Sequence, residues 1–108
     1  MTDLQQPENL SDKGKQAHSA ILAFLEKHGL TYTGGCRAFY SPKEWAERGE
    51  EYGDDGELIV VHDGGCVGDA FSYDNENYKM IEEMNETLKP LGVYSEPCTR
   101  WYTAIYLA

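Results

Sequence analysis

Residues 58–61, Leu-Ile-Val-Val, form the only uninterrupted apolar run of this chain that is rich in β-branched residues. Such a run is typical of a strand that is buried on both faces. His62 and Asp63 follow the run, and glycines at positions 64, 65 and 68 allow the backbone to turn tightly there. The pattern therefore predicts a central strand with polar groups at its end.

A helix is predicted over residues 11–28, because apolar residues recur there at helical spacing. Ser11 is its expected N-cap, and Gly-Leu at 29–30 is typical of a Schellman ending. A short second helix is predicted to start in Ser-Pro-Lys-Glu at 41–44, which has the serine and glutamate of a capping box and a proline at the first helical position. Trp45 is expected to anchor this helix to the core.

A third helix is predicted over residues 74–89, with Asp74 as N-cap and a proline and a glycine at its end. Further strands are predicted at 36–40, 69–73, 93–96 and 100–107, the last of which alternates Tyr102, Ala104 and Tyr106 with Trp101, Thr103 and Ile105. Together these elements predict an α+β domain: a two-layer, mainly antiparallel sheet of four to five strands with two main helices on one face and a short extra helix. We expect residues 1–10 to be a flexible leader and residues 11–108 to be a single α+β domain.

Composition favours a compact protein of one domain. The chain has 108 residues, of which 41% are hydrophobic and 12% aromatic, and this is too apolar for a disordered chain. No apolar run approaches the ~18 residues that a membrane span needs, so we expect a soluble protein. The three cysteines are an odd number at wide spacing, and the N-terminus lacks the features of a signal peptide. We therefore predict a cytoplasmic protein with reduced thiols.

His62 and the three cysteines are the candidates for metal or nucleophilic chemistry. Cys36, His62, Cys66 and Cys98 could supply four zinc ligands, but none of them forms the close cysteine pairs that structural zinc sites use. Cys66 beside His62 could act as nucleophile and base, with loop amides as an oxyanion hole. A hairpin turn explains the glycines equally well, and scattered core thiols explain the cysteines. We therefore predict no catalytic residue, no metal and no cofactor.

Charge is distributed unevenly along the chain. With 19 acidic and 9 basic residues the whole chain carries −10, and residues 44–86, with 14 acids and two bases, carry −12, so the remainder carries +2. This charge disfavours binding to nucleic acid or anionic membranes and favours a basic partner. A solvated acidic surface without a partner would explain the same pattern. The residues predicted to bind the partner, those of the third helix being included if it lies on the same side, are Glu44, Glu47, Glu50, Glu51, Asp54, Asp55, Glu57, Glu82, Glu83 and Glu86.

Three segments carry a resemblance that covers most of the chain from about Phe39 onward. They are SPKEWAERGEEYG at 41–53, LIVVHDGG at 58–65 and CTRWYTAIY at 98–106. The sequence resembles small acidic uncharacterised proteins carried by phages, prophages and plasmids. The resemblance implies an inhibitor of host defence, such as the anti-CRISPR and anti-restriction proteins that present DNA-like negative charge. These proteins offer no established active site, so no site residue is carried over.

We therefore expect a non-enzymatic inhibitor in the host cytoplasm that occupies a basic, nucleic-acid-binding surface of a host defence complex, in the manner of a DNA mimic. The expected partner is a protein or complex, with no direct binding to nucleic acid or to a membrane. Two alternatives remain open. One is a small enzyme, or a thiol or metal site, at His62 and Cys66, and the other is a homodimeric accessory protein with Tyr102 or Tyr106 in a self-interface.

Overall fold

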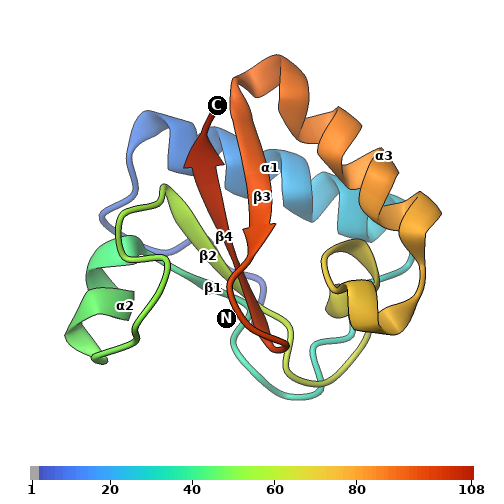
Figure 1. Cartoon of the computed structure of the whole chain (residues 1–108), viewed down its shortest axis with the longest axis horizontal. Coiled ribbons are helices and arrows are strands. Elements are labelled where there is room, and N and C mark those ends of the chain that lie inside the picture. Colours follow the sequence, from blue (N-terminus) through green and yellow to red (C-terminus); the bar gives the residue numbers. More distant parts are fainter. Residues whose placement is uncertain (1–2) are drawn as a thin grey trace.

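Residues 3–108 are described by the computed structural model, in which three α-helices accompany one four-stranded sheet (Figure 1). All strand pairs are antiparallel, and the strand order is β1-β2-β4-β3. The α+β fold predicted from the sequence is confirmed. In chain order the elements are α1 (Asp12–Lys27), β1 (Phe39–Tyr40), α2 (Pro42–Glu47), β2 (Leu58–Val61), the 3-10 helices η1 (Val67–Ala70) and η2 (Tyr73–Asn75), α3 (Tyr78–Leu88), the 3-10 helix η3 (Lys89–Leu91), β3 (Val93–Pro97) and β4 (Tyr102–Leu107).

β2 and β4 are the internal strands of the sheet, as the apolar run of β2 predicts. All four residues of β2 are buried. Leu58 and Val60 face the core under α1 and α3, whereas Ile59 and Val61 face a second core under α2. The sheet therefore separates α2 from the other two helices, and Figure 1 shows α2 well apart from α1 and α3.

Local sequence signals begin and end α1, and begin α2, as predicted. The Ser11 side chain caps α1 by accepting a backbone N–H of the first turn. At the other end, Gly29 has a φ of +69°, and the Leu30 N–H donates to the Leu25 carbonyl, which is the Schellman arrangement. α2 begins with the predicted capping box at Ser41. Within residues 3–108, no helix combines the length and the apolar character needed to cross a membrane.

Two predictions for the chain between β2 and α3 are wrong. Residues 69–73 do not form a strand, and α3 begins at Tyr78 rather than directly after an Asp74 cap. β1 and β4 already occupy both edges of β2, so a returning strand would find no free edge there. The segment instead closes into short turns, for example through the hydrogen bond from the Phe71 N–H to the Gly68 carbonyl at 3.1 Å.

The segment predicted as a flexible leader lies against the domain from Asp3 onward. The Asp3 carbonyl accepts a hydrogen bond from the Ala38 N–H at 2.8 Å, and the Leu4 carbonyl lies 2.9 Å from Nε2 of the buried His18. These contacts attach the described part of the segment to α1 and to the chain before β1. Residues 1–2, which belong to the same prediction, lie outside the described residues.

Candidate functional site

α2 holds the start of the acidic segment against the sheet. Trp45 is fully buried and packs on Ile59 and Val61, and its ring centroid lies 4.9 Å from that of Tyr102. Removing a buried ring of this size typically costs about 3–5 kcal/mol. α2 is thus firmly attached, and the acidic residues of the helix and of the following turn have a defined position.

Three acidic side chains around α2 are bound within the protein. Glu44 accepts two hydrogen bonds from the Arg37 guanidinium, each 2.8 Å long, and these bonds lower the pKa of Glu44. Glu50 forms an ion pair with Arg48 at 3.2 Å. Glu57 accepts a hydrogen bond from the N-cap hydroxyl of α1 at 2.6 Å. These carboxylates stabilise local structure and are less available to a partner.

Four other carboxylates on this side of the sheet are exposed to solvent. Within residues 3–108, Glu47, Glu51, Asp54 and Asp55 take part in no ion pair and no side-chain hydrogen bond. The turn that carries the two aspartates packs closely on the sheet at Gly53, where φ is +94° and a side chain would collide with the core. Gly53 anchors this turn on the sheet, and Trp45 anchors α2. The carboxylates of Glu47, Glu51, Asp54 and Asp55 therefore form a defined surface, called here the α2 acidic surface.

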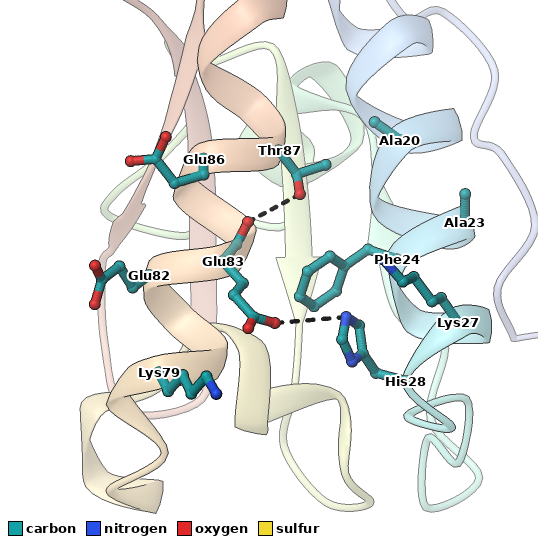
Figure 2. Close-up of a pocket in the computed structure, with 10 residues that line it drawn as sticks. All are labelled: Ala20, Ala23, Phe24, Lys27, His28, Lys79, Glu82, Glu83, Glu86 and Thr87. Atoms are coloured by element: carbon teal, nitrogen blue, oxygen red, sulfur yellow. Dashed lines mark hydrogen bonds and ion pairs between the residues drawn. The ribbon is translucent and has the colours of Figure 1, made fainter.

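The acidic residues of α3 lie on the other side of the sheet. A groove of about 830 Å³ separates α3 from α1 and is lined on the α1 side by two alanines and Phe24. Figure 2 shows Glu83 turned toward His28, with 3.7 Å between the carboxylate and Nε2, whereas Glu82 and Glu86 point away from α1. The ten residues predicted to bind a partner are therefore divided between two sides of the sheet.

His62 is a core residue. Its ring is stacked on that of Phe71, with 6.1 Å between the centroids, and its Nε2 lies 2.9 Å from the Thr103 hydroxyl oxygen. Burial lowers the pKa of His62 to about 4. A base with so low a pKa accepts protons poorly at neutral pH. The environment of this histidine therefore favours a structural role.

The Cys66 thiol makes its contacts with backbone carbonyls of the chain between α1 and β1. Its Sγ lies 3.6 Å from the Tyr32 carbonyl oxygen, and no hydrogen bond within residues 3–108 joins it to His62. Cys66 packs on the α1 side of the sheet and Cys98 on the α2 side. In the described part of the chain, no group of three or more His, Cys, Asp or Glu side chains is arranged to hold a metal ion.

The two Gly-Gly-Cys segments, at 34–36 and 64–66, lie against each other. The Cys66 N–H donates to the Tyr32 carbonyl at 2.8 Å. A Cβ placed on Gly34 would lie only 2.9 Å from the backbone nitrogen of Gly65. These glycines permit the close approach of the two loops.

Sequence reasoning missed a pair of tyrosines on the α2 side of the sheet. Tyr94 and Tyr106 lie opposite each other on β3 and β4, with ring centroids 5.8 Å apart. Strand alternation combined with this register would have revealed the pair. Tyr102, considered from the sequence for a self-interface, is instead buried, and its hydroxyl donates to the Tyr52 carbonyl at 3.0 Å.

Comparisons of the chain with protein-family models, with curated proteins and with solved structures gave no match. The resemblance to proteins of phages and plasmids thus rests on the three sequence segments alone.

Proposed function

We propose that this protein is a non-enzymatic binding protein that occupies a basic, nucleic-acid-binding surface of another protein. The observation that carries the proposal is the α2 acidic surface, in which Glu47, Glu51, Asp54 and Asp55 are exposed and have no partner within residues 3–108. The resemblance to phage-borne proteins suggests a host defence complex as the target, which would be met in the host cytoplasm. The three free thiols suit such a reducing compartment.

Grouping like charges costs stability, and this cost is recovered when a basic surface approaches. The field of exposed carboxylates extends over about a Debye length, ~8 Å at physiological salt, so it can steer a basic groove toward the protein. The buried Trp45 keeps the surface in place before binding. Little conformational freedom would then be lost on association, which favours affinity.

A pair of charge-matched variants tests this proposal. The first carries Glu47→Lys, Glu51→Lys and Asp54→Lys on the α2 acidic surface. The second makes the same change of charge on the other side of the sheet, in the layer formed by α1 and α3, called here the helical layer. Exposed substitutions usually change the free energy of unfolding by only about ±0.5 kcal/mol each, so both variants are expected to fold. The second, helical-layer variant carries the substitutions Glu26→Lys, Glu82→Lys and Glu86→Lys, all at exposed residues.

The measurement is capture of a protein from host lysate, followed by competition with duplex DNA and a salt series. We expect the parent and the helical-layer variant to capture the same protein, with DNA displacing it and salt weakening the complex. The α2 variant is expected to lose most of this binding. Equal capture by the α2 variant at low salt, or equal loss in both variants, would show that the α2 acidic surface is not the binding face.

A further inference from the structure

One part of the sheet face that carries α2 is open to solvent. Tyr106 packs beside Ala104 on this face, and Tyr94 lies directly opposite Tyr106 in the register, so both rings project on the α2 side. Tyr94 is 44% exposed, and Tyr106 is half-buried. The rings are tilted by 34°, with their centroids 5.8 Å apart. Together they form an aromatic surface at the β3 edge of the sheet.

α2 and the turn that follows it cover part of this face, and Tyr94 lies outside that cover. α2 has only six residues and packs through Trp45 near Tyr102. The turn after α2 reaches the tyrosine pair at Gly56, where an added Cβ would lie 3.5 Å from a ring carbon of Tyr106. Beyond this contact Tyr94 remains exposed. The pair therefore borders the α2 acidic surface and continues it toward β3.

Two carboxylates flank the tyrosine pair. Asp55 precedes the glycine that touches Tyr106, and Glu96 lies two residues after Tyr94 and so on the same face of β3. Neither carboxylate takes part in an ion pair within residues 3–108. Burial, the neighbouring thiol of Cys98, and the Asp55 and Glu96 carboxylates together raise the pKa of Tyr106 above its usual range. Asp55 and Glu96 therefore place negative charge next to Tyr106, at the edge of the aromatic surface.

We propose that this open part of the sheet is the docking site for an arginine side chain of the basic partner. The guanidinium would stack on the exposed ring of Tyr94 and donate hydrogen bonds to the carboxylate of Asp55 or Glu96. Arginine fits better than lysine because a planar guanidinium can stack on an aromatic ring and bind a carboxylate in the same pose. The inference rests on the proposed function, since it assumes a basic partner, and it adds the group that the partner inserts.

A second copy of the chain is a poorer occupant for this surface. Each copy carries −10, and a symmetric contact at the tyrosines would bring the Asp55 and Glu96 carboxylates of both copies together. Like charges in a contact of this kind oppose association. A cationic side chain from another protein meets no such penalty.

Titration of the full chain with N-acetyl-arginine amide, followed by NMR, tests the site without the host partner. N-acetyl-citrulline amide, which is nearly isosteric and uncharged, is the matched ligand control. We expect the arginine compound to shift the ring signals of Tyr94 and Tyr106 and the amides of Asp55 and Glu96. The citrulline compound is expected to leave them nearly unchanged.

Variants then separate the site from the general field of the protein. Tyr94→Leu, and separately Asp55→Asn with Glu96→Gln, are expected to weaken binding about two- to five-fold. Glu82→Gln with Glu86→Gln changes the net charge by the same amount on the other side of the sheet and is expected to have little effect. Preserved dispersion of the amide signals shows that each variant is folded.

Several results would overturn the inference. They are an absence of shifts at the tyrosines, equal affinity in Tyr94→Leu, or equal weakening by the Glu82 and Glu86 control. Tyrosine shifts that depend on protein concentration without ligand would assign the surface to a second copy instead. This titration involves no host protein, so the two proposals can fail separately. The arginine compound can fail to bind at the tyrosines although the lysine substitutions on the α2 acidic surface abolish capture, or it can bind there although those substitutions leave capture unchanged.

Discussion

Acidification is expected to destabilise this fold through His62. The imidazole is buried against Phe71 and Thr103, and its pKa falls from 6.5 to about 4 in the folded protein. Between these two values the unfolded chain binds a proton that the folded protein does not, so a falling pH favours unfolding. The stabilisation is complete above pH 6.5 and is lost progressively down to about pH 4.

The size of the effect follows from the two pKa values. A difference of one pKa unit corresponds to about 1.4 kcal/mol. The shift from 6.5 to about 4 therefore changes the free energy of unfolding by about 3 kcal/mol in total. By pH 5, before most carboxylates titrate, about 2 kcal/mol of this stability is expected to be lost. A domain of this size is typically stable by about 5–15 kcal/mol, so the loss is readily measurable.

Urea denaturation followed by tryptophan fluorescence at pH 7.5, 6.5, 5.5 and 5 measures the change, because the fully buried Trp45 reports unfolding. His62→Gln is the control: it is expected to lower the stability at pH 7.5 but to make it much less dependent on pH. An NMR titration of the His62 ring in the parent is a second measurement that does not require the variant to fold. Equal pH dependence of parent and variant, or a ring that titrates near 6.5, would refute the reasoning.

Two further predictions concern the loops around Cys66. Gly65→Ala would place a Cβ against the Tyr32 carbonyl, so it is expected to lower the free energy of unfolding by more than about 2 kcal/mol. Gly35→Ala is the control: Gly35 has a similar positive φ but open space around it, so the expected cost is only about 1 kcal/mol. Denaturation curves showing equal costs would argue against the loop contact. Cys66→Ser is expected to leave partner capture unchanged, and elemental analysis is expected to find no stoichiometric metal. Loss of capture in a folded Cys66→Ser variant would point to thiol chemistry after all.

The sequence was informative wherever the determining residues lie close together in the chain. The cap at Ser11, the ending at Gly29 and the capping box at Ser41 each depend on a few neighbouring residues, and each was predicted. β2 was predicted because four consecutive apolar residues can be buried only between two layers. Local chemistry alone is sufficient for these elements.

Residues 69–77 could not be predicted in the same way. Their pattern permits a short strand, and the strand fails to form because β4 pairs with β2 from the far end of the chain. The tyrosine pair was hidden for a related reason, since Tyr94 and Tyr106 become neighbours only in the register of β3 with β4. Both features depend on how distant segments pair, and the residue pattern of a single segment does not reveal its pairing partner.

The net charge of a chain segment differs from the charge on the one face of the protein that a partner contacts, and the positions of the acidic residues show why. Helical periodicity indicates which side of α3 faces water, but both faces of β2 are apolar, so either face could accept either helix. The structure places α2 and α3 on opposite faces. Packed layers lie roughly 10 Å apart, so the two helices are separated by roughly 20 Å, more than two Debye lengths at physiological salt. A partner on the α2 side therefore responds to the α2 acidic surface, with Glu96 beside it, and hardly at all to Glu82 and Glu86.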